Sequence, residues 1–251
     1  MPWHNHIDHD WASLRDFYRR HYFALYRHTI PEASSQVAHI LEVTGLQPPA
    51  RIADLGCGFG RHTIVLAAGG FQVIAVDFAC EMLSRARRHD WSGNVLALCA
   101  DLRALPLKRE PIFDAALLLF FTLSHFSLPQ QRGVLSAVRQ RCRSGAWLVV
   151  EVPGPAAFRG MAGRAVWQPL GGGPVVVDRR ISSDAQRVVV ERKVFSSDGQ
   201  RTYRLWLYPH GPESIRAALA EAGWQPVKLE GDWGQRDPAD ASSLLAFGRA
   251  E

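Results

Sequence analysis

The sequence predicts an α/β fold: a seven-stranded, mostly parallel sheet with helices on both faces, plus an antiparallel β-meander inserted before the last helix. Three observations predict it. Short apolar segments alternate with helical segments up to residue 152. A glycine-rich turn at residues 56–60 joins the first apolar segment to a helix. Residues 174–208 hold three strand-like segments separated only by turn-forming residues, which is typical of antiparallel pairing.

Two helices are expected before the first strand. Residues 13–30 carry aromatic side chains at helical spacing, and residues 32–46 form a second amphipathic pattern that Gly45 ends. The aromatic side chains that recur at helical spacing are Phe17, Tyr22, Phe23 and Tyr26. They fit an ordinary core helix and a lid helix over a cofactor equally well.

The core sheet and its helices follow in alternation. Strands are expected at residues 52–55, 73–76, 95–99, 113–120 and 147–152, with helices at residues 62–68, 79–88 and 129–142. Their near-continuous apolar character suits strands that are buried on both faces. After a loop at residues 153–173, the meander segments are 174–182, 186–195 and 202–208, and a helix at 212–222 precedes strands at 224–230 and 243–249.

These elements divide the chain into three parts. Residues 1–152 hold the N-terminal helices and the ligand-binding core, residues 153–210 form the antiparallel insert, and residues 211–251 complete the core sheet. The insert could roof a substrate cleft, form a homodimer face or simply pack on the sheet.

The amino-acid composition limits the classes of protein to which this chain can belong. The 251 residues are 47% hydrophobic and 21% charged, an ordinary globular composition. Apolar runs fall short of the roughly 18 residues of a membrane span, and no signal pattern opens the chain, so we expect a cytoplasmic protein. The net charge is +5, but the arginines are scattered, and the triplets at residues 85–88 and 139–143 should face water. Nucleic acid is therefore an unexpected partner.

Cysteine and histidine usage argues against a metal site. The four cysteines, at 57, 80, 99 and 142, form no C-x-x-C pair, so we expect reduced thiols and no zinc. Histidines 4, 6 and 9 lie in a terminal segment, where we expect no metal.

The glycine turn and the acid after the next strand indicate a nucleoside site. Gly56, Gly58 and Gly60 can take positive φ and let the backbone approach a ligand. Asp77 stands at the carboxyl end of the following strand, where a carboxylate can accept two ribose hydroxyls. A nicotinamide dehydrogenase is disfavoured because the spacing is G-C-G-F-G rather than G-x-G-x-x-G.

The run D-L-G-C-G-F-G-R-H at 54–62, with V-D at 76–77, resembles motif I of class I S-adenosylmethionine (SAM)-dependent methyltransferases. Together with D-L-R-A-L-P-L at 101–107 and F-D at 113–114, it is closest to small bacterial methyltransferases of type 11 and type 25. The resemblance covers roughly residues 20–250 and implies a Rossmann-like enzyme. It would transfer a methyl group from SAM to a small-molecule acceptor, such as a secondary metabolite, and leave S-adenosylhomocysteine.

The resemblance also implies which residues meet the cofactor. Asp54 and the glycines should surround the methionine end, Asp77 should hold the ribose, and the Asp101 region should read the adenine edge. The cofactor residues so expected are Asp54, Gly56, Cys57, Gly58, Gly60, Asp77, Phe78, Met82, Asp101, Leu102, Leu119, Tyr22 and Tyr26. Asp101 could instead cap a turn, and Phe78 and Met82 could be ordinary core.

The sequence says less about which residues would contact the methyl acceptor. The loop from Leu119 to Phe126 should border the methyl group, and its His125 is a candidate general base, a substrate contact or a plain loop residue. Glu151 and Trp206 are candidate acceptor contacts. A nucleic-acid methyltransferase would be expected to carry an N/D-P-P-Y/F run or a P-C pair after the fourth strand, where this chain has F-F-T-L-S-H-F. A SAM-binding cyclase or another non-methylating protein is a further alternative.

Overall fold

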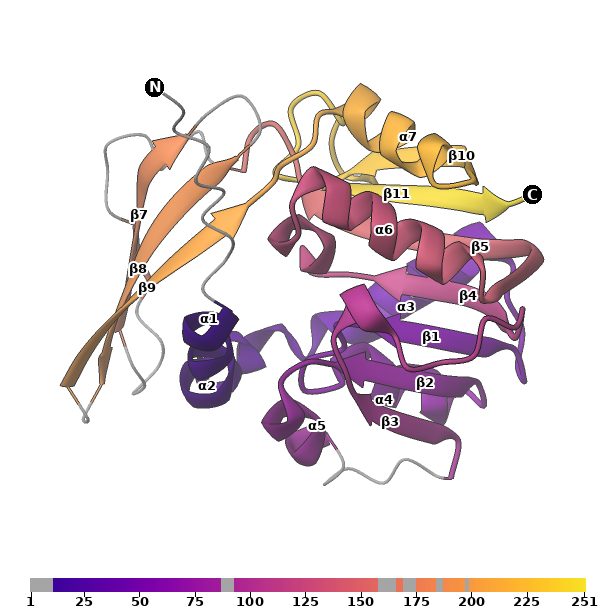
Figure 1. Ribbon diagram of the computed structural model, residues 1–251, viewed down its shortest axis with the longest axis horizontal. Coiled ribbons are helices and arrows are strands. Elements are labelled where there is room, and N and C mark those ends of the chain that lie inside the picture. Colours follow the sequence, from indigo (N-terminus) through magenta and orange to yellow (C-terminus); the bar gives the residue numbers. More distant parts are fainter. Residues whose placement is uncertain (1–10, 87–92, 158–165, 169–174, 184–186, 197–198) are drawn as a thin grey trace.

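The computed structural model describes residues 11–86, 93–157, 166–168, 175–183, 187–196 and 199–251. Its central feature is the predicted seven-stranded, mostly parallel sheet (Figure 1). The strand order is β10-β11-β5-β4-β1-β2-β3. The strands are β1 (Arg51–Leu55), β2 (Gln72–Asp77), β3 (Val95–Cys99), β4 (Phe113–Leu118), β5 (Cys142–Pro153), β10 (Trp224–Gly231) and β11 (Ser243–Ala250). β1 to β5 pair in parallel, and β11 runs antiparallel between β5 and β10.

Helices cover both faces of this sheet, because its strands are apolar on both sides. α3 (Glu32–Thr44) and α4 (Arg61–Ala68) pack on one face, and α6 (Leu128–Arg139) and α7 (Pro212–Glu221) pack on the other. Along β5, Leu148 and Val150 face α6 and α7, whereas Trp147 and Val149 face α3 and α4. The strand order reverses between β1 and β4, which opens a crevice at their carboxyl ends.

The N-terminal helix is confirmed, with one irregularity. It consists of α1 (Trp11–Phe17), a π-helical turn (Tyr18–Tyr22), α2 (Phe23–Tyr26) and a 3₁₀ turn (Arg27–Thr29). Phe17 packs against Val194 and Tyr203 of the insert. The segment therefore lies between the core sheet and the insert (Figure 1).

The insert forms a sheet of its own, as predicted, but it has four described strands rather than three. β6 (Val166–Gln168), β7 (Val175–Ser183), β8 (Val188–Ser196) and β9 (Gly199–Leu207) pair antiparallel in this order. We expected loop at residues 153–173 because prolines and glycines cluster there. The short β6 is held by its pairing with β7, which a local pattern does not reveal.

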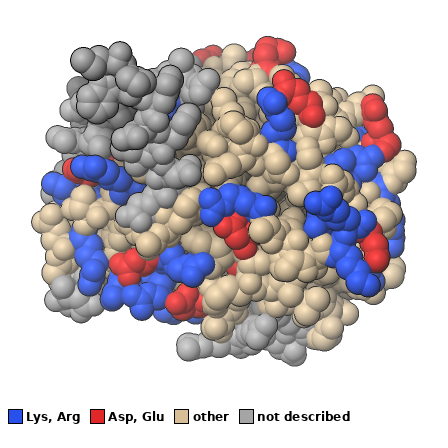
Figure 2. Space-filling view, in the orientation of Figure 1, with Lys and Arg blue, Asp and Glu red and all other residues tan. Residues whose placement is uncertain are grey.

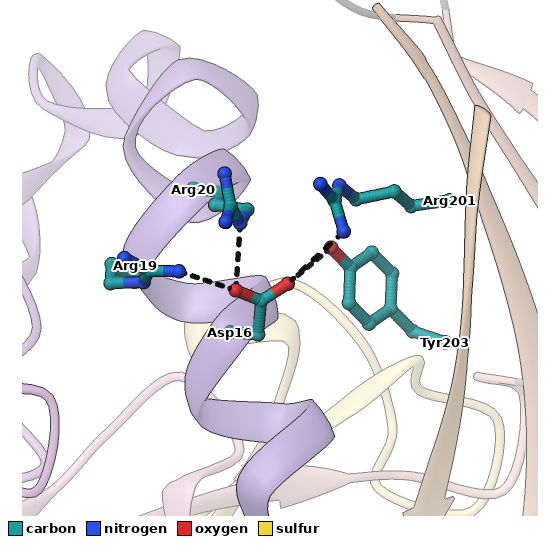
Figure 3. Close-up of polar contacts among 5 residues, drawn as sticks. All are labelled: Asp16, Arg19, Arg20, Arg201 and Tyr203. Atoms are coloured by element: carbon teal, nitrogen blue, oxygen red, sulfur yellow. Dashed lines mark hydrogen bonds and ion pairs between the residues drawn. The ribbon is translucent and has the colours of Figure 1, made fainter. Parts of the chain in front are cut away.

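A charged network fastens α1 to β9 (Figure 3). The Asp16 carboxylate accepts hydrogen bonds from Arg19 at 2.8 Å, Arg20 at 2.7 Å and the Tyr203 hydroxyl at 3.1 Å, and Arg201 lies 4.0 Å away. Partial burial opposes the charge, but these hydrogen bonds outweigh it and lower the pKa of Asp16 to about 2. The network ties the N-terminal helix to the insert.

Two expectations about side chains are wrong. Cys80 and Cys99 form a disulfide between α5 (Cys80–Ala86) and β3, whereas Cys57 and Cys142 are free. The pairing arises because β3 runs beside β2, with Cys99 opposite Asp77. Arg141, expected to face water, is buried and donates to the carbonyls of residues 105, 107 and 137.

The visible surface mixes both charge signs (Figure 2). Lysine and arginine side chains lie beside aspartate and glutamate rather than in one basic stripe. Among the described helices, none is long and apolar enough to cross a membrane. The described residues contain no group of potential metal ligands, and histidines 4, 6 and 9 lie outside them.

We expect Asp16→Ala to lower the free energy of unfolding by about 1 kcal/mol at pH 7, because it removes charge-assisted hydrogen bonds that are partly screened by water. The folded pKa of Asp16 is depressed, so its contribution is present above about pH 4 and is lost as the pH falls toward 2. Urea unfolding at several pH values measures both effects. Glu213→Ala, at an exposed ion pair on α7, is the matched control and should change nothing measurable. Additive losses for Asp16→Ala and Tyr203→Phe would contradict a shared network.

Candidate functional site

The glycine turn after β1 has the left-handed geometry that its composition predicts. Gly56, Gly58 and Gly60 have φ values of 76°, 56° and 79°. A Cβ at Gly56 would lie 2.4 Å from Thr122, so only glycine fits between this turn and the loop after β4. The turn therefore brings bare backbone to the carboxyl edge of the sheet.

Hydrogen bonds to Asp77 connect this turn to the end of β2. Its buried carboxylate accepts hydrogen bonds from Gly58 N and Ala79 N, both at 2.8 Å. Burial outweighs these hydrogen bonds and raises the pKa of Asp77 to about 6. A carboxylate has about four acceptor positions, so each oxygen can accept a further hydroxyl.

A cavity with about 580 Å³ of empty space opens above this edge. Eight of the residues predicted for the cofactor or acceptor line it: Gly56, Gly58, Asp77, Phe78, Asp101, Leu102, Tyr22 and His125. The structure therefore brings together residues from the turn, from the ends of β2 and β3, and from the N-terminal helix. The lining suits a nucleoside, because it offers carboxylates and aromatic rings.

Other predicted residues support the cavity from outside its described lining. Asp54 is buried behind the turn, where it accepts a 2.5 Å hydrogen bond from Thr63, and burial raises its pKa to about 6. Met82 packs beneath with Phe59, and Leu119 belongs to the core. Gly60 starts α4, and Cys57 is partly buried in the turn.

Asp101 lines the cavity and also caps a turn, so the expected cap is present, and the adenine contact stays a prediction. Its carboxylate accepts from Arg103 N at 2.9 Å and pairs with the Arg103 guanidinium at 2.6 Å. Partial burial opposes the charge, but these contacts lower the pKa of Asp101. The carboxylate is thus held as an anion at the rim.

Several lining residues were not among the predicted site residues. Trp11, Leu14 and Tyr18 of the N-terminal helix, and Phe120, Thr122 and Phe126 of the loop after β4, complete the wall. The available signal was the helical stripe, which continues upstream as Trp11, Leu14 and Tyr18. The N-terminal helix both packs in a core and covers the cavity.

Arg61 was also missed. It is buried, stacks over the Phe120 ring at 5.0 Å, and donates through Nη1 to Thr29 O and Gln36 Oε1. Its Nη2 is buried and has no hydrogen-bond partner among the described residues. A buried guanidinium nitrogen without an acceptor is costly, so an anionic group fits beside it.

A second cavity, with about 890 Å³ of empty space, adjoins the first and shares five lining residues with it: Leu14, Tyr18, Tyr22, Phe120 and His125. Tyr26, predicted for the cofactor, lines this second cavity. Leu205 and Leu207 of β9 also line it, so the insert forms its roof. Trp206 alternates with these two leucines along β9 and therefore lies on the opposite face of the strand.

His125 and Tyr18 meet at the junction of the two cavities. The Tyr18 hydroxyl lies 3.1 Å from His125 Nε2. Burial raises the pKa of Tyr18 above its ordinary value, so the hydroxyl keeps its proton at neutral pH. The pair can therefore pass a proton between a bound acceptor and the imidazole.

Glu151, which we predicted as an acceptor contact, holds the loop that follows β4. Its buried carboxylate accepts from Phe120 N at 2.8 Å and from Trp233 Nε1 at 3.0 Å. Burial raises its pKa. Phe120, Phe121 and Trp233 have φ values of 53°, 65° and 59°, in the left-handed region that disfavours non-glycine residues. Glu151 lines a third cavity, on the other side of Phe120 and Phe121.

Residues 52–145 match the family described as "Methyltransferase domain". The chain spans about half the length of most curated relatives that it matches. A carboxy-S-adenosyl-L-methionine synthase of Hydrogenovibrio crunogenus is 27% identical over 49% of this chain and 51% of its own length. A trans-aconitate 2-methyltransferase of Mycolicibacterium gilvum is 26% identical over 76% of this chain and 80% of its own length.

Solved structures share the fold. The CcbJ methyltransferase from Streptomyces caelestis has a TM-score of 0.73 at 21% identity, covering 88% of this chain and 90% of its own. SAM-bound CalS10, an amino pentose methyltransferase from Micromonospora echinaspora, has a TM-score of 0.68 at 24% identity, covering 91% and 96%. In residues 52–145, which carry the glycine turn and the first strands of the sheet, the chain is similar to methyltransferase domains, and it shares the fold of SAM-dependent methyltransferases.

Proposed function

We propose that this protein transfers the methyl group of SAM to a small-molecule acceptor by in-line displacement. The observation that carries the proposal is the pair of adjoining cavities. One is built on the glycine turn and Asp77, the other lies under the insert, and they meet at Tyr18, Tyr22 and His125. A methyl donor and an acceptor could thus lie in contact without water between them.

The first cavity suits the adenosyl and methionine parts of SAM. Asp77 retains acceptor capacity for two ribose hydroxyls, and such charge-assisted hydrogen bonds contribute about 1.5–3 kcal/mol each. Phe78 offers a ring for the adenine, and the buried Arg61 Nη2 suits the methionine carboxylate. Bound SAM supplies a methyl group that its positive sulfur already activates.

The protein itself would align the reacting atoms, exclude water from them and remove a proton from the acceptor. Alignment of the reacting atoms can contribute about 7–11 kcal/mol to lowering the barrier. Phe120, Tyr18 and Tyr22 stand where the two cavities join and would keep water from the reacting atoms. The Tyr18 hydroxyl would take the acceptor's proton while passing its own to His125 Nε2.

The size and lining of the second cavity favour a small acceptor. Its described lining is mostly aromatic and aliphatic and lies under the insert, unlike an open basic groove for nucleic acid. Relatives named for trans-aconitate, and a structural neighbour named for an amino pentose, support a small-molecule acceptor. A cytoplasmic location and a homodimer built on the insert remain predictions.

A second candidate is a protein that alters SAM itself, since one relative is a carboxy-S-adenosyl-L-methionine synthase. Methyl-labelled SAM incubated with the protein and a small-molecule extract separates the two. Methyl transfer should give one S-adenosylhomocysteine for each labelled product. Labelled SAM that keeps its methyl group while gaining mass would instead identify a cofactor-modifying enzyme.

Asp77→Ala should weaken SAM binding by about 10-fold or more, because it removes the charge-assisted hydrogen bonds to the ribose and releases the glycine turn. Isothermal titration calorimetry measures the change, with Glu213→Ala as an exposed control of unchanged affinity. In the wild type, affinity should rise as the pH passes upward through about 6, where Asp77 loses its proton. Equal affinity in the wild type and Asp77→Ala would remove the ribose assignment.

His125→Ala should lower turnover by about 10²-fold or more while SAM affinity stays near that of the wild type, since proton transfer typically contributes 10²–10⁴-fold. Tyr18→Phe keeps the ring that lines both cavities and should lower turnover in the same direction. Steady-state assays of S-adenosylhomocysteine formation across pH 6–9 test the relay. Turnover that neither variant alters at any pH would exclude it.

A further inference from the structure

We propose that Gln131 and His210 are positioning residues for the reaction, because together they hold the loop that carries His125. Neither belongs to the described lining of the two adjoining cavities, so they would act through His125 rather than on substrate or cofactor. The inference rests on the function proposed above. It adds how the proton-accepting pair of that site is kept in place.

The backbone carbonyls of the residues before and after His125 are both held by hydrogen bonds. The carbonyl of Ser124 accepts from Tyr208 N at 2.9 Å. The carbonyl of Phe126 accepts from Gln131 Nε2 at 3.0 Å. The loop is therefore fixed on each side of the imidazole, once by the segment after β9 and once by α6.

Hydrogen bonds continue from Gln131 to His210, and one fact sets their directions. A carbonyl oxygen can only accept, so the amide nitrogen of Gln131 must face Phe126, and its Oε1 must face His210 Nε2 at 2.7 Å. His210 therefore carries its proton on Nε2, which leaves Nδ1 to accept from Ser214 Oγ at 2.9 Å. The amide of Gln131 thus has a partner at each end, and His210 keeps it from turning.

Burial makes these hydrogen bonds costly to break. The Gln131 and His210 side chains have relative exposures of only 1% and 4%, so water cannot readily replace a lost partner. Burial also lowers the pKa of His210 to about 4, so its ring is neutral near pH 7 and keeps the tautomer that donates to Gln131. The pair therefore holds one arrangement at physiological pH.

The segment that carries His210 also continues the roof of the second cavity. Leu205 and Leu207 of β9 line that cavity, and Tyr208 follows them directly. His210 lies between β9 and α7, and its backbone N–H donates to Pro153 O at 3.3 Å, at the end of β5. The loop after β4 is thus positioned relative to the proposed acceptor site and to the core sheet at once.

The start of α6 does not require Gln131. That end of the helix has its own cap, because Gln130 Oε1 accepts from Ser127 N at 3.0 Å. Gln131 instead reaches back beyond the cap to Phe126, a residue that lines the first cavity. Its hydrogen bond therefore serves the loop rather than the helix.

Coupling between Gln131 and the Tyr18–His125 pair tests the proposal. The probe is the His125 imidazole, observed by NMR in protein labelled with ¹⁵N-histidine, both free and saturated with S-adenosylhomocysteine. Tyr18→Phe should shift the His125 Nε2 signal, because it removes the hydroxyl that lies 3.1 Å away. In Gln131→Met, which keeps the length of the side chain but neither polar group, Tyr18→Phe should cause about half of that shift or less.

Variants of His210 test the second residue. His210→Met should reduce the shift as Gln131→Met does. His210→Gln places an amide N–H donor near the position of Nε2 and should restore most of the shift. Gln140→Met, the same substitution at the exposed other end of α6, is the control and should keep the full shift.

The outcomes separate this proposal from the proposed function. A full shift in both Gln131→Met and His210→Met would overturn the positioning role, and so would the absence of any shift on Tyr18→Phe alone. Equal losses in His210→Met and His210→Gln would show that packing, not the hydrogen bond, holds the loop. Failure of the folded protein to bind S-adenosylhomocysteine would instead overturn the methyltransferase function, while the free protein still reports the coupling. If Gln131→Met does not fold, the two His210 variants decide.

Discussion

The buried carboxylate of Asp77 is the constraint on which the cofactor edge depends. It accepts one N–H from the turn after β1 and one from the residues that follow β2, so two loops share one anion. Burial already raises its pKa to about 6, and loss of either N–H would leave a buried charge less well satisfied. The left-handed Gly58 supplies one of these donors. Asp77 therefore sets the turn and the start of α5 together, and with them the position that we propose for the ribose.

Glu151, like Asp77, is a buried carboxylate that accepts hydrogen bonds from two different loops. It holds Phe120 N and Trp233 Nε1, and so joins the loop after β4 to the loop after β10. Left-handed non-glycine residues cost about 1–3 kcal/mol each, and Phe120 and Phe121 persist in this conformation because Glu151 and the surrounding packing over-determine it. Phe120 lines all three cavities described above, so this carboxylate positions a residue that lies between the proposed cofactor and acceptor sites.

The sequence was sufficient for the features that arise from local patterns. The seven core strands, the glycine turn, Asp77 and the separate antiparallel insert follow from apolar periodicity, turn residues and the resemblance. The disulfide between Cys80 and Cys99 and the burial of Arg141 were mispredicted, because both depend on which elements become neighbours. The hydrogen bonds of Glu151 had no local signal, because its partners lie 31 and 82 residues away.

The acceptor site was harder to predict for a further reason. Tyr18 and His125 are 107 residues apart, and Tyr26 and Arg192 are 166 residues apart. The first pair forms when the N-terminal helix packs on the loop after β4, and the second when it packs on the insert. Residues 52–145, the part that matches the methyltransferase domain family, do not include Tyr18, Tyr22, Tyr26 or Arg192. A family match confined to the cofactor half is compatible with relatives named for very different acceptors. The N-terminal helix and the insert meet through Asp16 and Tyr203, so the walls of the second cavity depend on two segments that lie outside the glycine turn.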